Sequence, residues 1–177
     1  MNYTPAQFLD YELNHGINAD NPTFTALAEA TVKAIKEPVI SVLDFGAGTG
    51  VYSAAFHRAG YDVYAYEIWE EHKAYIREKF PYVKFASAPF TTDLMLFIEV
   101  AEHMTEQEIR NLFKEIRPKY ILFSSTPHKN PGFDEEWGHI NVQNKALWLG
   151  LFEDLGYQYV HDLHVPTEWA FMLKLKA

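Results

Sequence analysis

An acid and three alternating glycines stand out as residues that could hold a ligand. They lie in the segment 42–50, which reads Val-Leu-Asp-Phe-Gly-Ala-Gly-Thr-Gly, and the acid is Asp44. An apolar run leads into this segment and a helical pattern begins at Val51, so a buried strand is expected to turn sharply into a helix. Backbone without Cβ atoms lets a ligand lie close to the main chain, near the positive end of that helix.

The spacing of the glycines decides between ligand classes. A dinucleotide site has the form G-x-G-x-x-G, which would need glycine at position 51, where this chain has Val51. This argues against a nicotinamide-dependent dehydrogenase. The segment has the form D-x-G-x-G-x-G instead, with Asp44, Gly46, Gly48 and Gly50. It resembles motif I of class I S-adenosylmethionine-dependent methyltransferases.

The resemblance implies a site for S-adenosylmethionine. Glu67 ends an apolar run about twenty residues after the glycine segment, where a carboxylate can accept hydrogen bonds from both ribose hydroxyls. Ile68 or Trp69 would press on the adenine face, and Ser87 stands where many relatives have an acid for the adenine amino group. The cofactor residues expected on this basis are Asp44, Gly46, Ala47, Gly48, Gly50, Glu67, Ile68, Ser87 and Glu99.

A second group of residues could do the chemistry. Glu99, Glu102 and His103 are spaced i, i+3 and i+4, which puts their side chains on one face of a helical turn. The run 98–103 is similar to the E-V-L-E-H run of many class I methyltransferases, whose fold implies that the loop carrying His139 lies beside it. Two carboxylates and two imidazoles that converge suit a divalent cation.

The E-x-x-E-H pattern with a distant histidine resembles the metal site of the small-RNA 3′-terminal 2′-O-methyltransferases. It is also similar to a segment of the ubiquinone-biosynthesis O-methyltransferases. The resemblance implies that Glu99, Glu102, His103 and His139 bind Mg²⁺, Mn²⁺, Co²⁺ or Zn²⁺, which makes an acceptor hydroxyl more acidic. Without a metal, His103 or His139 would act as general base with Glu102 nearby. In a third interpretation, Glu99 meets the cofactor's amino group while Glu102 and His103 only brace a turn.

Strands that alternate with helices must position these groups. This alternation of strands and helices predicts an α/β, Rossmann-like three-layer sandwich. The resemblance further implies that the sheet has seven strands, is mostly parallel and has a C-terminal antiparallel strand. The expected strands are 39–45, 62–66, 83–86, 94–98, 120–125, 157–163 and 168–175, and the expected helices are 4–14, 24–35, 51–59, 69–80, 105–117 and 142–155. Residues 126–140 are expected to form a loop. Every candidate residue follows a strand, where ligands bind in such sheets.

Composition narrows the class of methyl acceptor that is expected. The net charge of −9 disfavours non-specific binding of nucleic acid, so a small molecule is the expected acceptor and the terminal nucleotide of an RNA is the second choice. The chain has no cysteine, which excludes methylation through a cysteine nucleophile. The segment 99–102 lacks the Asp/Asn-Pro-Pro-Tyr/Phe run typical of exocyclic-amine N-methyltransferases. An O-methyltransferase is therefore favoured, and a non-catalytic cofactor-binding partner subunit is the alternative.

Length and hydropathy suggest how the chain is organised. The 177 residues fit one methyltransferase domain over 1–177, with N-terminal helices within 1–37 that cover the site. Neither a secretory signal nor an apolar run long enough to span a bilayer is present, and a cytoplasmic protein is expected. His57 and His72 are expected on exposed helix faces, and Arg110, Lys114 and Arg117 on another.

Overall fold

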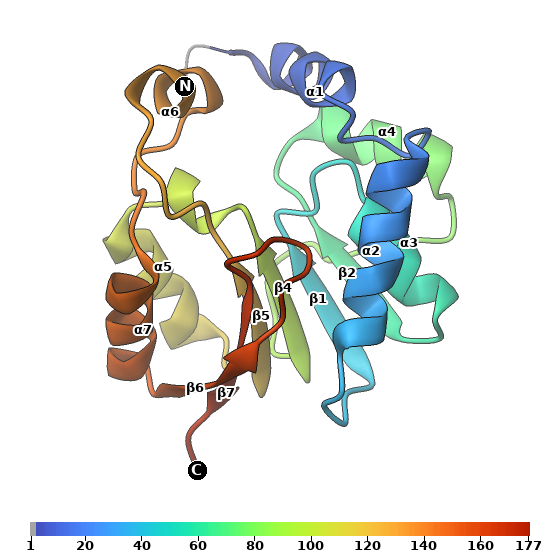
Figure 1. Ribbon diagram of the computed structural model, residues 1–177. Coiled ribbons are helices and arrows are strands. Elements are labelled where there is room, and N and C mark those ends of the chain that lie inside the picture. Colours follow the sequence, from blue (N-terminus) through green and yellow to red (C-terminus); the bar gives the residue numbers. More distant parts are fainter. Residues whose placement is uncertain (1–2) are drawn as a thin grey trace. The chain divides into compact units, whose positions relative to one another are not determined.

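The computed structural model describes residues 3–177, which form two compact units (Figure 1). The N-terminal unit comprises residues 3–89 and the C-terminal unit residues 90–177. Each unit combines strands with helices, and each is described here by itself. No helix in the part of the chain that the structure describes has the length and apolar content needed to cross a membrane.

The N-terminal unit contributes three parallel strands to the seven-stranded sheet. Its elements are α1 (Pro5–Asn14), α2 (Pro22–Ala34), β1 (Ser41–Phe45), α3 (Val51–Arg58), β2 (Asp62–Tyr66), α4 (Glu70–Lys79) and β3 (Lys84–Phe85). The strands follow the order β3-β2-β1 and all run parallel. Helix α2 packs against α3, and α1 against α4. Buried Ala28, Val51, Ala54 and Ile76 pack together in its core.

Local sequence explains where the helices of this unit begin. The Thr4 hydroxyl caps α1 by accepting a hydrogen bond from the Gln7 amide, and Oε1 of Gln7 accepts a hydrogen bond from the Thr4 amide. Asn21 caps α2 by accepting from the Thr23 amide, and each helix has proline at its first position. These caps satisfy amide groups that a helix start leaves without partners.

The C-terminal unit contributes four strands to the seven-stranded sheet. Its elements are β4 (Leu94–Ile98), a 3-10 turn (Ala101–His103), α5 (Glu106–Glu115), β5 (Tyr120–Ser124), α6 (Pro131–Trp137), α7 (Lys145–Asp154), β6 (Tyr157–Asp162) and β7 (Phe171–Leu175). The order is β4-β5-β7-β6. Strands β4 and β5 are parallel, while β7 runs antiparallel to both β5 and β6. The expected α/β class, with mostly parallel strands and a reversed C-terminal strand, is confirmed.

The segment 126–140 was expected to be a loop, and this is wrong in part. Residues Pro131–Trp137 form α6, which ends at Gly138 in a left-handed conformation with φ 75°. Proline at the first position and glycine just after the last are both typical of a short helix. Helix α7 also begins later than expected, at Lys145, because Asn144 caps it by accepting from the Leu147 amide.

Candidate active site

The glycine segment forms a tight loop between β1 and α3. Gly46, Gly48 and Gly50 have φ values of 72°, 52° and 74°, in the left-handed region that residues with a Cβ atom rarely adopt. The amides of Gly46 and Ala47 donate to the Tyr66 carbonyl at the end of β2, at 2.9 and 3.1 Å. The loop is therefore tied to the neighbouring strand and presents bare backbone before the first turn of α3.

Glu67 follows β2 and is held by this loop. Its carboxylate is 7% exposed and accepts hydrogen bonds from the amides of Gly48, Ile68 and Trp69, at 3.0, 2.7 and 3.0 Å. Three amide donors fix its orientation, and one lone pair on Oε2 remains for a further donor. Ile68 is 66% exposed, so an apolar side chain without protein cover stands beside this acid. Ser87 lies two residues after β3 and is exposed.

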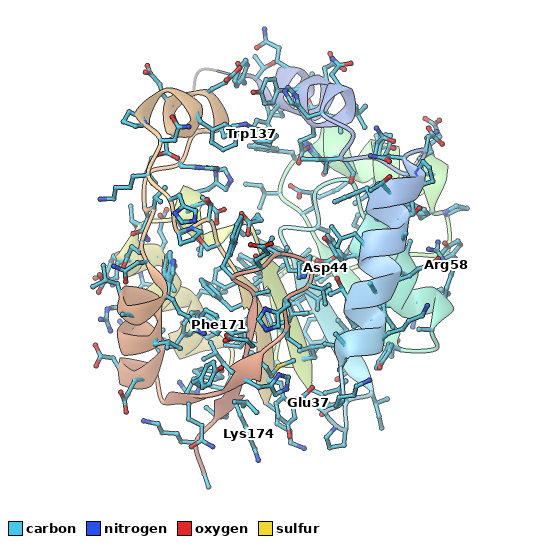
Figure 2. The ribbon with its side chains drawn as sticks, in the orientation of Figure 1. Glu37, Asp44, Arg58, Trp137, Phe171 and Lys174 are labelled. Carbon is cyan, nitrogen blue, oxygen red and sulfur yellow. The ribbon has the colours of Figure 1, made fainter. Side chains whose placement is uncertain are left out.

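Asp44 lies under the loop, near the end of β1 (Figure 2). It is 4% exposed and accepts a 2.6 Å hydrogen bond from the Ser53 hydroxyl of α3. Burial raises the pKa of Asp44 from 3.8 to about 6, although the Ser53 hydrogen bond acts in the opposite direction. The carboxylate therefore links the strand to the helix that follows the glycines.

In the C-terminal unit, Glu99 directly follows β4 in a strained backbone conformation. Its φ is 52°, which is unusual for a residue with a Cβ atom. The Ser124 hydroxyl and the Trp169 indole N–H both donate to its Oε1 atom, at 2.5 and 3.1 Å. The local structure thus turns Glu99 toward the end of β5 and the segment before β7.

Glu102, His103 and His139 come together as a cluster. One ligand atom from each lies within 4.8 Å of the others, and the two imidazole rings pack edge to face with centroids 4.9 Å apart. Glu99 is not part of this group, so the expected set of four is only three. The 3-10 turn begins at Ala101, and Glu99, with its left-handed backbone conformation, lies before this turn.

Glu102 is the most deeply buried member of the cluster. Its exposure is 0%, and neither carboxylate oxygen has a hydrogen-bond partner among residues 3–177. Burial raises the pKa of Glu102 well above its ordinary value, and the nearby charge of Glu99 adds to this. Burial, followed by the proximity of His139, lowers the pKa of His103 to about 4. His103 is therefore neutral at pH 7, as a metal ligand must be, but it is a weak general base.

Asp134 orients His139 and was not expected from the sequence. Its Oδ1 atom lies 3.0 Å from Nδ1 of His139, and the two side chains are only 14% and 6% exposed. Oδ2 of Asp134 accepts from the Asn130 amide at 2.8 Å, which anchors the carboxylate at the start of α6. An Nδ1–H that donates to Asp134 leaves Nε2 of His139 with its lone pair. The Pro131 and Gly138 signals for α6 could have revealed this element.

His72 was expected on an exposed helix face, and this is wrong. It is 1% exposed, and its Nε2 atom lies 2.7 Å from Oε2 of Glu12 in α1. The rings of Phe8 and Trp69 pack against its imidazole, with centroids 6.3 and 5.1 Å away. Sequence periodicity did not indicate the pair of Glu12 and His72, because α1 covers the face of α4 that was expected to be exposed to solvent.

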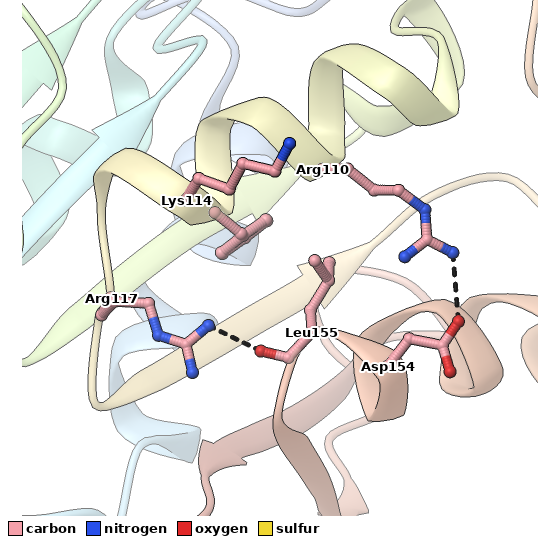
Figure 3. A pocket seen from close by; sticks show the side chains of 6 residues that line it. Arg110, Lys114, Arg117, Asp154 and Leu155 are labelled. Atoms are coloured by element: carbon pink, nitrogen blue, oxygen red, sulfur yellow. Dashed lines mark hydrogen bonds and ion pairs between the residues drawn. The ribbon is translucent and has the colours of Figure 1, made fainter.

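A surface hollow of about 430 Å³ lies in the C-terminal unit, and none of the candidate site residues lines it. It is lined by Arg110, Phe113, Lys114, Arg117, Asp154 and Leu155 (Figure 3). Arg110 donates to Asp154 at 3.1 Å, and Nη1 of Arg117 donates to the Leu155 carbonyl at 2.7 Å. These contacts join α5 and the segment that follows it to the end of α7, so both arginines have a structural role there.

Comparison with known protein families identifies the family to which the chain belongs. The family model described as a methyltransferase domain matches residues 18–162. The chain belongs to this family. The match confirms the S-adenosylmethionine-dependent methyltransferase expected from motif I. No curated protein matches the sequence.

Solved structures similar to this methyltransferase share its fold at low sequence identity. DesVI of Streptomyces venezuelae has a TM-score of 0.69 and 13% identity, with all of both chains covered. The magnesium protoporphyrin IX methyltransferase of Synechocystis PCC 6803, solved with bound SAH, has a TM-score of 0.67 and 17% identity, covering 97% of this chain and 95% of that one. TnmH has a TM-score of 0.72 and 13% identity over 97% of this chain, which spans 59% of the TnmH chain. The expected Rossmann-like fold is thereby confirmed.

Proposed function

We propose that this methyltransferase transfers the methyl group of S-adenosylmethionine to a hydroxyl of a small molecule, with help from a divalent cation. The observation that carries the proposal is the buried carboxylate of Glu102, which has no donor within residues 3–177 and lies beside two imidazoles. The charge of −9 and the small-molecule acceptor named for the Synechocystis enzyme favour a small molecule over RNA.

The proposed cofactor site is the glycine loop with the acid that follows β2. Bare backbone at Gly46 and Gly48 would let the adenosyl group lie close to the loop. Glu67 would accept hydrogen bonds from the ribose hydroxyls, and exposed Ile68 would cover one face of the adenine. Asp44 would act through the loop backbone and water. Ala47, Gly50, Ser87 and Glu99 complete the proposed set.

The donor set of the cluster fits a metal ion. One carboxylate and two imidazoles suit Zn²⁺, Co²⁺ or Mn²⁺ better than Mg²⁺, which prefers oxygen ligands. Glu102, His103 and His139 would hold the ion, and Asp134 fixes the tautomer that leaves Nε2 of His139 available. A bound ion would lower the pKa of the acceptor hydroxyl. The hydroxyl would lose its proton to water, and its oxygen could then bond to the methyl carbon in line while the carbon–sulfur bond breaks and the sulfonium leaves as a neutral thioether.

If no ion binds, His139 is the better of the two general bases. Its imidazole is paired with a carboxylate in the manner of a catalytic dyad, whereas the pKa of His103 is only about 4. In that case His139 takes the proton of the hydroxyl at Nε2, and Asp134 stabilises the imidazolium. The two mechanisms differ in their dependence on metal.

Calorimetry followed by turnover assays tests the proposal. S-adenosylmethionine is titrated into the chelator-treated protein first. Mg²⁺, Mn²⁺, Co²⁺ and Zn²⁺ are then titrated into wild type, into the double variant His103→Ala/His139→Ala, and into His57→Ala as a control on α3. We expect micromolar binding of one or more transition ions to wild type and to the control, and none to the double variant. Methylation of phenol and vicinal-diol acceptors should need the same ion.

Other outcomes separate the alternatives. Equal ion binding by wild type and the double variant would exclude the metal site. Turnover that persists in chelator but is lost in His139→Ala would favour the general base. Binding of S-adenosylmethionine without turnover of any acceptor would favour a non-catalytic partner subunit.

A further inference from the structure

The buried pair of Glu12 and His72 lies next to the glycine loop within the N-terminal unit. Glu12 is 9% exposed, and its Oε2 atom is 2.7 Å from Nε2 of His72. A Cβ atom placed on Gly48 would lie 3.5 Å from Oε1 of Glu12. Helix α1 therefore brings a carboxylate oxygen to the backbone of the central glycine in the loop.

The two oxygens of Glu12 have different environments. Oε2 is satisfied by His72, while Oε1 has no hydrogen-bond partner among residues 3–177. Nδ1 of His72 is also buried without a partner among the described residues, as expected for the tautomer that carries its hydrogen on Nε2. His72 thus donates to one oxygen of Glu12 and holds the other toward Gly48.

The surroundings of this pair offer few hydrogen-bond donors, and the Glu12 side chain keeps only 12% of its surface exposed. Phe8 and Trp69 flank the pair with aromatic rings, which solvate a carboxylate poorly. Burial raises the pKa of Glu12, His72 opposes this, and the charge of Glu67 raises it further. A second carboxylate close to the same loop adds repulsion that a ligand with several hydrogen-bond donors would relieve.

We infer that Glu12 is a further cofactor-binding residue, whose Oε1 atom accepts a hydrogen bond from the adenosyl cofactor over the glycine loop. This inference rests on the cofactor site proposed above. Ribose hydroxyls and the amino group of the methionine moiety are the donors of suitable chemistry, and the product S-adenosylhomocysteine carries the same donors. Helix α1 is then held against the bound cofactor, and His72 acts as a positioning residue for Glu12.

The test is calorimetric binding of S-adenosylmethionine and S-adenosylhomocysteine to wild type and Glu12→Gln. Glutamine can keep its carbonyl on His72 and then presents an amide donor, in place of an acceptor, to the ligand. We expect both affinities to fall by about tenfold or more, since a hydrogen bond to a charged group is lost. Asp10→Asn removes the same charge from an exposed position of α1 and should leave both affinities unchanged.

Hydrogen exchange provides a measurement that needs no variant. S-adenosylhomocysteine added to wild type should slow amide exchange across Pro5–Asn14, because the ligand contacts α1. Thermal unfolding checks that Glu12→Gln is folded. If Glu12→Gln is not folded, the hydrogen-exchange result on wild type decides whether the ligand contacts α1.

The remaining outcomes have distinct meanings. Unchanged affinity in folded Glu12→Gln, or unchanged exchange in α1 when wild type binds the ligand, would overturn the role of Glu12 and leave the proposed function intact. A loss confined to S-adenosylmethionine would show an effect of the sulfonium charge and overturn the shared hydrogen bond. Wild type that binds neither compound would overturn this inference together with the proposed function.

Discussion

Nδ1 of His139 and Oδ1 of Asp134 are 3.0 Å apart, and this contact determines which nitrogen of the imidazole is free to act. Histidine ligands of metal ions commonly donate their second N–H to a carboxylate, which orients the ring and raises its basicity. Asp134 is held in turn by the Asn130 amide. The pair therefore stabilises one tautomer and one ring position of His139.

Asp134→Asn should weaken metal binding without changing cofactor binding. The asparagine amide can donate to Nδ1 and thereby stabilise the wrong tautomer, so we expect the affinity for the preferred ion to fall by about 10–100-fold. Calorimetry with the ion and with S-adenosylhomocysteine measures both effects. Glu135→Gln, an exposed neighbour on α6, is the matched control. Equal ion affinities for Asp134→Asn and this control would show that Asp134 does not support a ligand.

Glu102→Met should stabilise the metal-free protein. Methionine has a similar volume and needs no hydrogen bonds, whereas the buried carboxyl has no partner in the described residues 3–177. In chelator we expect the free energy of unfolding to rise by about 1–3 kcal/mol. Saturating ion should stabilise wild type and leave the variant unchanged. Glu115→Met, exposed at the end of α5, controls for general hydrophobic effects. A variant less stable than wild type in chelator would contradict the prediction.

Asp44→Asn should stabilise the protein at pH 8. The folded state raises the pKa of Asp44 from 3.8 to about 6, so the protonated carboxyl favours folding and that contribution is lost as pH rises through about 6. The raised pKa corresponds to about 3 kcal/mol. Asparagine needs no proton, so urea unfolding should show a gain of about 1–3 kcal/mol at pH 8, which falls to about a third of that value at pH 4.5 and nearly disappears only well below pH 3.8. A gain that does not depend on pH would point to another cause.

Gly50→Ala should destabilise the N-terminal unit more than Gly60→Ala. Both glycines have positive φ, 74° and 95°, so both variants incur backbone strain of about 1–2 kcal/mol. A Cβ atom at position 50 would lie 2.7 Å from Cγ1 of Ile76, whereas one at position 60 meets nothing within 4 Å. We expect a further loss of about 1–3 kcal/mol at position 50 in urea unfolding. Equal losses would mean that Ile76 moves aside freely.

Local physics explains why much of the fold could be predicted. Three glycines in left-handed conformations, with an acid before them, define the loop between β1 and α3 through backbone sterics alone. Thr105 and Glu108 form a reciprocal cap three residues apart, and Leu94–Ile98 is a continuous apolar run, so both elements were predictable from neighbours in sequence. Helix α6 was missed because it is short and polar.

The sequence by itself determined the methyltransferase loop, the acid after β2 and the histidines available for chemistry, because each depends on residue type and short spacing. Only the tertiary structure decided which side chains meet. It joined His72 to Glu12 across sixty positions, placed Asp134 behind His139, and paired Glu99 with Ser124 and Trp169. Such contacts arise where elements distant in sequence pack together, and periodicity within one element does not encode its partner.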